Sequence, residues 1–349
     1  MRSTENVSWF SDITLANRPT VGGKGGSLGE LTRANIAVPF GFVVTTQGFE
    51  RVLAELEKEI PIRQRVEALS LHDEREVRLL SEELRARVQR APMPEDVCAD
   101  ILAAHDVLCG SDLSCPLAVR SSATAEDSQE ASFAGLQDTY LWVKSAEAVL
   151  QYVRACWASL YSVGSISYRL KDGTPEKGVA IAVVVQKMVH ARSAGVMFTR
   201  SPLTGDRSVI TIESAWGLGS AVVSGEVTPD RFVISKITGQ ISVREISDKR
   251  MRHVPAETGG IEHAETPEEL RRPPSISDHE LKALAEIGRK VERHYGRPQD
   301  IEWAIDYAGE IFFLQSRPET VWSSKDKAPI AKPAEKPFLH VMNIFGGRR

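Results

Sequence analysis

The strongest constraint on the fold is the stretch DIEWAIDYAGEIFFLQSRP at residues 300–318, in which apolar and polar side chains alternate on both sides of an Ala-Gly pair. This pattern predicts two antiparallel strands joined by a tight turn. A symmetric turn of even length places Glu302 opposite Gln315 and Asp300 opposite Arg317, with all four side chains on one face. The other face carries the apolar residues that we expect in a core, which are Ile301, Trp303, Ile305, Phe312 and Leu314.

The polar face of this predicted hairpin suits two kinds of ligand. The carboxylate of Glu302 beside the carboxamide oxygen of Gln315 suits a hard cation such as Mg²⁺. The guanidinium of Arg317 suits phosphate, which it can bind through two hydrogen bonds. An edge hairpin with a solvated polar face explains the same residues equally well, because half-polar strands are common.

A second candidate is the glycine-rich stretch VGGKGGSLGEL at residues 21–31. It is not a Walker A loop, because Arg18 stands where the first glycine belongs and Gly25 where the magnesium-binding hydroxyl belongs. It is not a dinucleotide fingerprint either, because Leu28 replaces the third glycine. A flexible backbone beside Lys24 still suits an anion, although a plain glycine turn with a solvated lysine fits as well.

A helix is predicted to start within this stretch. Ser27 and Glu30 have the spacing of a capping box, in which each side chain satisfies a backbone N–H at the start of a helix. The N-terminus of a helix favours anions, so this placement supports a phosphate ligand near Lys24.

Two further segments carry polar groups at the end of a predicted strand. The loop VRSSATAEDSQEASFAGLQDT at 119–139 has Arg120 at its mouth, and it is either a lid that closes over a triphosphate or a disordered connection. The buried strand that ends in VVVQKMV at 183–189 brings Gln186 and Lys187 to its edge, where they either meet an adenine or simply reach solvent.

Composition excludes several classes of protein. With 349 residues, of which 42% are apolar and 26% charged, the chain is neither fibrous nor disordered and is long enough for two or three lobes. Its 43 basic and 47 acidic residues give a net charge of −4, so nothing favours nucleic acid or an anionic membrane as a partner. No apolar run approaches the ~20 residues of a membrane span, and we expect a cytoplasmic protein.

Cysteine and histidine give no sign of a metal site along the chain. The four cysteines show no paired metal-ligand spacing, and reduced thiols are expected. The eight histidines are scattered, so each is expected to be exposed or satisfied by a neighbour.

The order of the predicted elements indicates an α/β (α+β) protein of two lobes. We expect an N-terminal lobe at residues 1–188, a C-terminal lobe with the hairpin at 189–322, and a linker or tail at 323–349. A Pro- and Glu-rich connection is predicted at 255–276, before a helix at 277–295.

Six segments together resemble one family in order and spacing. They are VGGKGGSLGEL, VPFGFVV, AVRSSATAEDSQEASFAGLQDTYLWV, GVMFTRSPLTGD, ESAWGLGSAVVSGEVTPDRFVI and DIEWAIDYAGEIFFLQSRP. Over about residues 8–322 the chain resembles the ATP-binding region of the phosphoenolpyruvate synthase and pyruvate phosphate dikinase family, which also includes rifampicin phosphotransferase. The resemblance implies an ATP-grasp fold whose two lobes clamp MgATP.

Carried over by position, the resemblance implies that Lys24 and Arg120 bind the phosphates of ATP. It implies that Gly135 and Thr139 belong to the loop that closes on those phosphates.

For the remaining positions, the resemblance implies that Gln186 and the backbone at Met188 meet the adenine. It implies Glu302 and Gln315 as ligands of Mg²⁺, and Arg317 as a clamp on the phosphates. Lys24, Arg120 and Arg317 are the residues expected to act in catalysis.

The sequence departs from the family pattern in two ways. Ser220 follows the Gly-Leu-Gly turn where the family usually has Glu, so a ligand role there is in doubt. The swivelling domain with a phosphorylatable histidine does not occur within the 349 residues. We therefore expect phosphoryl transfer from ATP to a histidine on a separate domain or subunit, giving AMP and phosphate overall.

The final acceptor is open at the level of sequence. Resemblance to the small ATP-binding subunit of phenylphosphate synthase favours phenol. The alternatives are the ATP-binding domain of a phosphoenolpyruvate synthase or rifampicin phosphotransferase, and a non-catalytic nucleotide-binding regulator.

Overall fold

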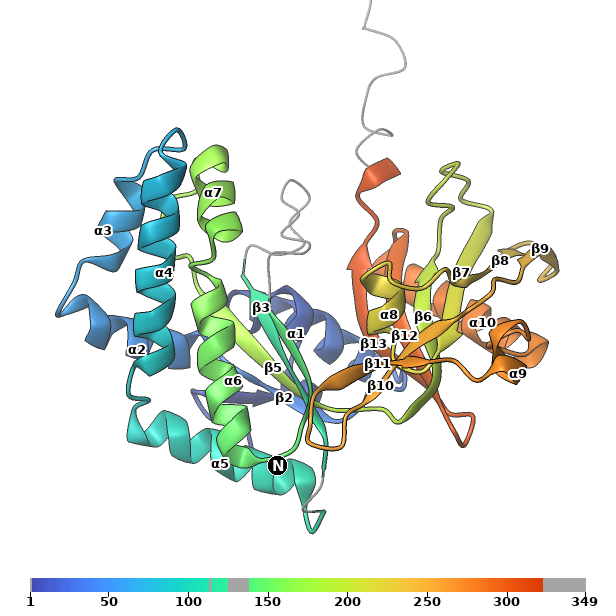
Figure 1. Cartoon of the computed structure of the whole chain (residues 1–349), viewed down its shortest axis with the longest axis horizontal. Helices are drawn as coiled ribbons and strands as arrows, with labels where there is room; N and C mark the ends of the chain where they lie inside the picture. The colour runs from blue at the N-terminus through green and yellow to red at the C-terminus, as the bar shows by residue number, and fades with distance from the viewer. Residues whose placement is uncertain (1, 113–114, 125–137, 323–349) are drawn as a thin grey trace, which may run out of the picture.

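The computed structural model describes residues 2–112, 115–124 and 138–322, which form two lobes side by side (Figure 1). Each lobe combines helices with an antiparallel sheet, which confirms the predicted α/β (α+β) class. In the described ranges, no helix is both long enough and apolar enough to cross a membrane.

The first lobe is built on a five-stranded sheet with the order β1-β2-β5-β3-β4. Its strands are β1 (Val7–Trp9), β2 (Gly41–Val44), β3 (Leu117–Ala123), β4 (Thr139–Val143) and β5 (Ile181–Lys187). Its helices are η1 (Phe10–Asp12), η2 (Leu15–Asn17), α1 (Arg18–Arg33), α2 (Thr46–Glu57), α3 (Ile62–Glu67), α4 (Glu74–Arg90), α5 (Glu95–Cys109), α6 (Ala146–Ser159) and α7 (Val163–Asp172).

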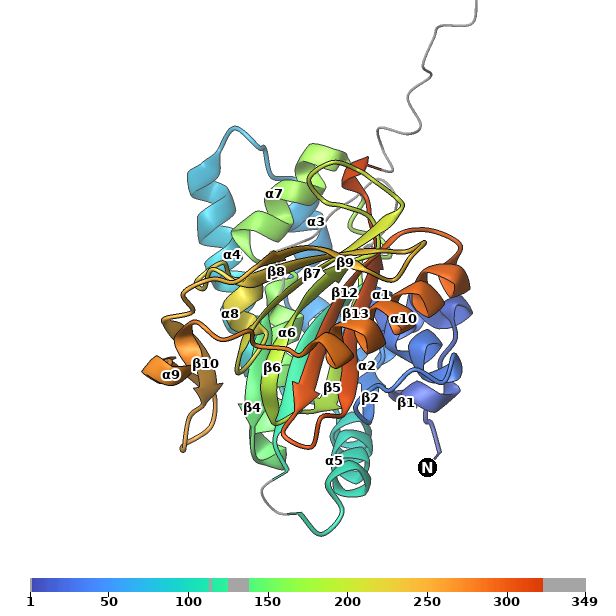
Figure 2. The same cartoon turned by 90° about the vertical axis from the view of Figure 1, so that its right-hand side faces the viewer.

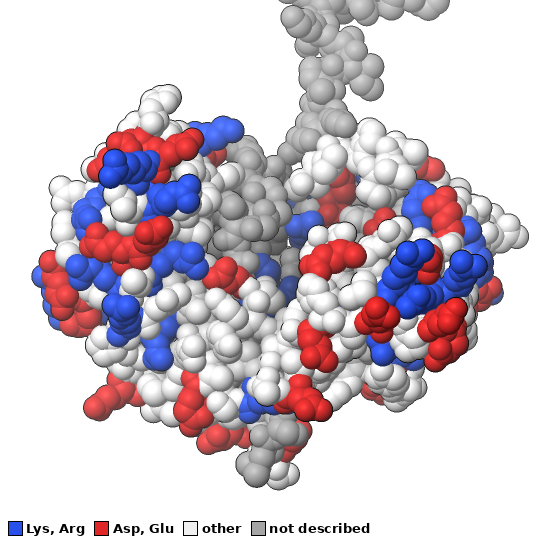
Figure 3. All heavy atoms as spheres, in the orientation of Figure 1, with Lys and Arg blue, Asp and Glu red and all other residues white. Residues whose placement is uncertain are grey.

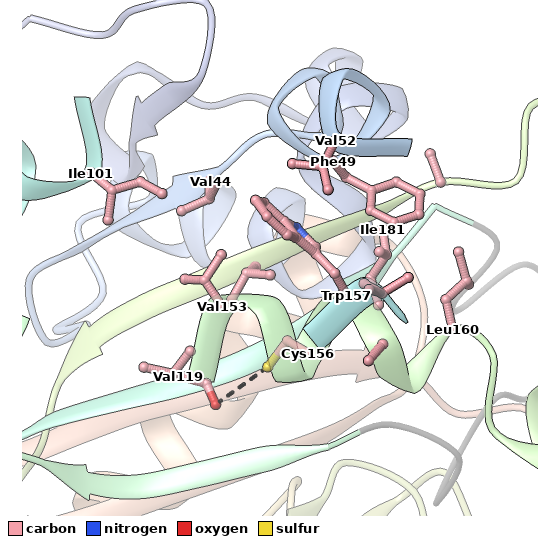
Figure 4. Close-up of a cluster of buried hydrophobic side chains, with 14 of the residues drawn as sticks. Val44, Phe49, Val52, Ile101, Val119, Val153, Cys156, Trp157, Leu160 and Ile181 are labelled. Atoms are coloured by element: carbon pink, nitrogen blue, oxygen red, sulfur yellow. Dashed lines mark hydrogen bonds between the residues drawn. The ribbon is translucent and has the colours of Figure 1, made fainter. Parts of the chain in front are cut away.

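The core of this lobe lies between the sheet and α2, α5 and α6 (Figure 4). As the helical spacing of the sequence predicts, α6 turns Val149, Val153 and Trp157 into this core, and Leu160 follows at its end. Trp157 packs beside Phe49 of α2, with ring centroids 6.2 Å apart. The central strand β5 is buried along almost its whole length, which is why it reads as a continuous apolar run.

The second lobe is built on a six-stranded sheet with the order β13-β12-β6-β7-β8-β9. Its strands are β6 (Ala191–Phe198), β7 (Val209–Trp216), β8 (Asp230–Ser235), β9 (Ile241–Glu245), β12 (Gln299–Asp306) and β13 (Ile311–Pro318). The other elements are α8 (Ser220–Val223), the hairpin of β10 (Met251–Pro255) and β11 (Ile261–Glu265), α9 (Glu268–Arg271) and α10 (Asp278–Tyr295). The amphipathic helix α10 covers one face of the sheet, beside α1 (Figure 2).

The chain passes from the first sheet to the second between Lys187 and Ala191. The boundary that we propose at residues 188–189 falls within this passage. The connection predicted at 255–276 contains two short elements that were not predicted, β11 and α9.

The pairing of β12 with β13 confirms the predicted partners Glu302–Gln315 and Asp300–Arg317. Beyond Glu302 the register shifts by one residue, so that Trp303 pairs with Phe313. The cause is the turn, which is a loop of odd length closed by a hydrogen bond of 3.1 Å from the Asp306 N–H to the Glu310 carbonyl oxygen. A bulge between Glu302 and Trp303 then returns the strands to the predicted pairing of Glu302 with Gln315.

The prediction that Phe312 and Leu314 face this core was therefore wrong. Phe313 occupies the core of the second lobe with Trp303, whereas Phe312 and Leu314 pack on the opposite face, in a cluster with Met188.

Candidate functional site

The glycine-rich segment forms a kinked helix that docks against β3. Within α1, Gly22 has φ 71° and ψ −178°, so a second helical stretch begins after it with Lys24 in its first turn. Ser122 of β3 holds the kink in place, because its Oγ donates to the Val21 carbonyl at 2.9 Å and accepts from the Gly25 N–H at 3.1 Å. A Cβ on Gly22 would overlap the backbone oxygen of Ser122. Lys24 is buried beside this docked turn.

The predicted capping box of Ser27 and Glu30 was wrong, because both residues lie inside the helix. Their side chains reach the second lobe instead. The Ser27 hydroxyl donates to the Ser316 carbonyl at 2.5 Å, and the Glu30 carboxylate lies 2.8 Å from His294 Nε2. The helix that carries Lys24 is thus fastened to β13 and to α10.

Arg120 lies two residues before Ser122 on β3, so both side chains point to the same face of the strand. Its guanidinium crosses to the hairpin of the second lobe. Nη1 donates to the Leu314 carbonyl at 2.9 Å, and Nη2 donates to Gln315 Oε1 at 2.6 Å and to Glu302 Oε2 at 3.1 Å. Arg120 is 8% exposed, and the Glu302 side chain is 30% exposed.

This contact joins Arg120 to Glu302, which lies 182 positions later in the sequence. It brings a predicted phosphate-binding cation onto the two predicted metal ligands. Thr139, another predicted site residue, is the cross-strand partner of Arg120 at the start of β4, and its side chain is exposed.

Arg317 lies on the same hairpin but has a different partner. Its Nε is 3.6 Å from Asp300 Oδ2, and its side chain is 42% exposed, so it lies at the solvent side of the hairpin. Gly135 is outside the described residues, and its predicted place in a closing loop stays a prediction.

The predicted adenine-side residues lie at the end of β5. Gln186 is buried between β2 and β3, and its Nε2 donates to the Pro39 carbonyl at 3.2 Å. The Met188 N–H donates to the Pro116 carbonyl at 2.9 Å, so that group is already engaged within the first lobe. The Met188 side chain packs with Leu218 and Leu314 of the second lobe, which forms an apolar patch between the lobes.

Charge is distributed unevenly around this region. Lys and Arg atoms are visible in the recess between the two lobes, whereas the outer faces mix both signs (Figure 3). The contact between the lobes thus combines the cation of Arg120, two oxygen atoms of the hairpin that can bind a metal, and an apolar patch. These are the features that a nucleotide with a metal ion requires.

Comparison with known proteins identifies a family model and relatives that match this chain. A family model described as the AMP/ATP-binding domain of pyruvate phosphate dikinase matches residues 18–337. A probable phosphoenolpyruvate synthase from Methanothermobacter thermautotrophicus is 44% identical over 317 residues, which cover 90% of this chain and 46% of the relative. A rifampicin phosphotransferase from a Streptomyces species is 41% identical over 312 residues, which cover 89% of this chain and 35% of the relative.

A phosphoenolpyruvate synthase from Aeropyrum pernix is 41% identical over 362 residues, covering 95% of this chain and 44% of the relative. The chain thus spans less than half the length of these curated relatives. The match confirms the resemblance and, with it, the predicted ATP-grasp fold class. The chain belongs to the family of ATP-binding domains found in pyruvate phosphate dikinase and phosphoenolpyruvate synthase.

Proposed function

We propose that this chain binds MgATP between its lobes and supplies a phosphoryl group to a histidine on a separate swivelling domain or subunit, giving AMP and phosphate overall. One observation in the structure supports the proposal in addition to family membership. Arg120 of the first lobe contacts Glu302 and Gln315 of the second, so a phosphate-binding cation and two metal-binding oxygens meet at one point of the lobe interface.

The donor set suits Mg²⁺, which prefers carboxylate and carbonyl oxygens. Glu302 Oε2 and Gln315 Oε1 would hold the ion, and both oxygens accept from Arg120 Nη2 in this structure. When bound, the ion neutralises charge on the phosphate oxygens. Binding of MgATP therefore requires Arg120 to turn from these two oxygens toward the phosphates, while its bond to the Leu314 carbonyl can persist.

In the transfer step, the histidine nitrogen attacks the β-phosphorus, and the bond from that phosphorus to the oxygen bridging to the α-phosphate breaks. AMP leaves with the electron pair of that bond, so the histidine of the partner carries the β- and γ-phosphates as a pyrophosphoryl group. Water then attacks the γ-phosphorus, the bond from that phosphorus to the β–γ bridging oxygen breaks, and phosphate leaves. The β-phosphoryl group stays on the histidine for transfer to the acceptor. Lys24, Arg120 and Arg317 stabilise the charge that develops on the phosphate oxygens. The adenine lies against Gln186 and the Met188 patch.

For the complete reaction we propose phenol as the acceptor, on the resemblance to the small subunit of phenylphosphate synthase. The description of the family and the name of one relative provide the alternatives, pyruvate and rifampicin. In this proposal the chain supplies the nucleotide site, and the acceptor depends on the histidine-bearing partner.

The test uses ATP labelled at the β or the γ position, with and without a histidine-bearing partner, and with phenol, pyruvate or rifampicin as acceptor. We expect label on the partner only when this chain and Mg²⁺ are both present. Rapid release of AMP by the chain alone would contradict the split reaction. Tight ATP binding with no label on any partner would identify a regulator instead.

A pair of variants locates the site within this test. Glu302→Ala is expected to abolish Mg²⁺-dependent transfer while the fold is retained, because it removes the carboxylate of the proposed metal site. Glu310→Ala is the matched control, since Glu310 is an exposed carboxylate on the turn of the same hairpin. Equal activity of the two variants would remove Glu302 from the site.

A further inference from the structure

The hairpin of β10 and β11 brings two histidines together. In its antiparallel register, His253 lies directly opposite His263, and the two imidazole rings stack with centroids 4.3 Å apart. Opposite residues of an antiparallel pair project to the same face. Spacing along the sequence gave no hint of this pair, because neither strand of the hairpin was predicted.

A carboxylate from a third segment completes the cluster. Glu226, which follows α8, places Oε2 3.2 Å from His253 Nε2 and 3.1 Å from His263 Nδ1. The three ligand atoms all lie within 4.8 Å of one another. Ligands of a tetrahedral ion at ~2.0–2.2 Å are about 3.3–3.6 Å apart, so the separations of 3.2 and 3.1 Å need to widen only slightly to admit the ion.

We propose that Glu226, His253 and His263 form a binding site for a divalent transition-metal ion of the Zn²⁺ class, separate from the oxygen site on the β12–β13 hairpin. Two imidazole nitrogens and one carboxylate oxygen favour Zn²⁺, Co²⁺ or Ni²⁺ over Mg²⁺. Water would complete the coordination shell.

The buried histidine is held in an orientation suited to a ligand. His253 Nδ1 lies 2.8 Å from the hydroxyl of Ser220, and its Nε2 points to Glu226. A hydrogen bond at Nδ1 orients the ring, and with the serine oxygen accepting from the Nδ1–H group, Nε2 carries the lone pair that a metal needs. Ser220 thereby acts as a positioning residue, at the place where the family usually has Glu.

The other two ligands can adjust. The side chains of His263 and Glu226 are 56% and 44% exposed, whereas that of His253 is 5% exposed. Coordination requires the ring of His263 to tilt out of its stack so that Nδ1 points at the ion. Its exposure leaves room for this movement, and the buried ring of His253 stays in place.

The location gives such an ion a structural consequence. The β10–β11 hairpin crosses in front of the gap between the lobes (Figure 1). At its tip, the Gly260 N–H donates to the Trp142 carbonyl at 3.3 Å, and Lys144 of the first lobe donates to the Glu257 carbonyl at 2.6 Å. At its base, the His253 carbonyl accepts from the Leu218 N–H at 3.0 Å. An ion at the cluster would tie the β10–β11 hairpin to the segment that follows α8 in the second lobe.

The test is metal binding by the whole chain, freed of metal by chelation and titrated in excess Mg²⁺, which saturates oxygen sites. We expect one Co²⁺ ion per chain, with visible absorption typical of low coordination number, and displacement by Zn²⁺. Hydrogen exchange of the 251–265 segment is expected to slow when Zn²⁺ is added.

Variants decide the assignment. His263→Ala and Glu226→Gln are expected to weaken Zn²⁺ binding at least tenfold, and Ser220→Ala by about 10-fold through loss of the second-shell hydrogen bond. His279→Ala is the matched control, because His279 is exposed on α10, away from the cluster. Both His263 and Glu226 are exposed enough for substitution without unfolding, and ATP binding reports a retained fold.

Two outcomes would overturn the proposal. One is the absence of stoichiometric Co²⁺ or Zn²⁺ binding by the parent chain. The other is equal affinity of His263→Ala and His279→Ala, which would place the bound ion elsewhere.

Discussion

At the scale of single residues, the candidate site depends on side chains that form hydrogen bonds between the two lobes. Arg120 makes three hydrogen bonds to the second lobe from a position that is 8% exposed. Its planar guanidinium presents several donors in a fixed fork, which a lysine ammonium on a flexible stem cannot reproduce. Arg120 is thus both a lobe contact and the cation that we propose for phosphate.

The first prediction is that Arg120→Lys lowers phosphoryl transfer by about 100-fold or more, the usual cost of a lost transition-state hydrogen-bond donor. The unfolding free energy should fall by about 1–3 kcal/mol, because Gln315 Oε1 and the Leu314 carbonyl lose a donor. Transfer assays and denaturant unfolding measure the two effects. Arg75→Lys on the exposed side of α4 is the control, and equal behaviour would remove Arg120 from both roles.

The second prediction concerns Gly22, whose positive φ only glycine adopts cheaply. Gly22→Ala is expected to cost at least about 2 kcal/mol and to weaken ATP binding, because the new Cβ overlaps the Ser122 backbone and displaces the turn that carries Lys24. Gly26→Ala is the control for stability. A Cβ there makes ordinary contact with Arg18 at 3.7 Å, and alanine favours the helix by up to about 1 kcal/mol.

Denaturation midpoints of the two alanine variants measure this difference. If Gly22→Ala were as stable as Gly26→Ala, the kink in α1 would not require glycine.

At the scale of elements, a cluster of ion pairs joins α3 to α4. Arg65 binds Glu83 through two hydrogen bonds of 2.8 Å, and Arg87 adds a third contact of 3.1 Å. The hydrogen bond from Arg65 is the main reason that the pKa of Glu83 falls from its ordinary value of 4.5 to about 2. The lowered pKa means that the folded state favours the ionised carboxylate.

The third prediction follows from this sign. A carboxyl group with a lowered folded-state pKa stabilises the fold above its unfolded pKa, and this contribution fades as pH falls from about 4.5 toward 2. Because the side chain is 36% exposed, solvent screening limits the effect to about 1 kcal/mol. Glu83→Gln should therefore be less stable than the parent at neutral pH and equal to it near pH 2.

Chemical unfolding of both proteins across this pH range checks the prediction. A constant difference between them at every pH would show that Glu83 acts through packing instead of charge.

Elements also show where prediction from sequence succeeds. The pairs Glu302–Gln315 and Asp300–Arg317 could be predicted because strand alternation is local and has a period of two. The bulge after Glu302 could not, because it depends on the conformation of one turn, in which Gly309 has φ 86°. The contact of Arg120 with this hairpin depends on tertiary packing, which no local pattern encodes.

The β10–β11 hairpin was missed for a related reason. Its strands have mostly exposed or half-exposed side chains, so they lack the apolar alternation that marks a half-buried strand. Proline and glutamate in this region indicated a connection without strands. His253 and His263 are brought together only by pairing of the strands, so their cluster was invisible in the sequence.

At the scale of the whole molecule, α1 belongs to both lobes. Val21 and Leu28 pack against the first sheet, whereas Leu31 and Ile36 are buried in the core of the second lobe. The Ala37 carbonyl accepts from the Phe313 N–H at 2.8 Å, which attaches the segment after α1 to β13. If the chain is divided at residue 188, part of the hydrophobic core of the second lobe therefore comes from residues before that division.

The last prediction tests this shared core with Leu31→Ala. Removal of a fully buried leucine typically costs about 2–5 kcal/mol. Leu31 lies among the first 188 residues, yet we expect the loss of hydrogen-exchange protection to be larger in β7 of the second lobe than in β5 of the first, because its side chain packs in the second core. Leu79→Ala, at an exposed position of α4, is the control. Loss of hydrogen-exchange protection confined to β5 would contradict this expectation. It would show that the lobes unfold as the separate segments divided at residue 188, and that α1, which carries Lys24, does not couple the first lobe to the second.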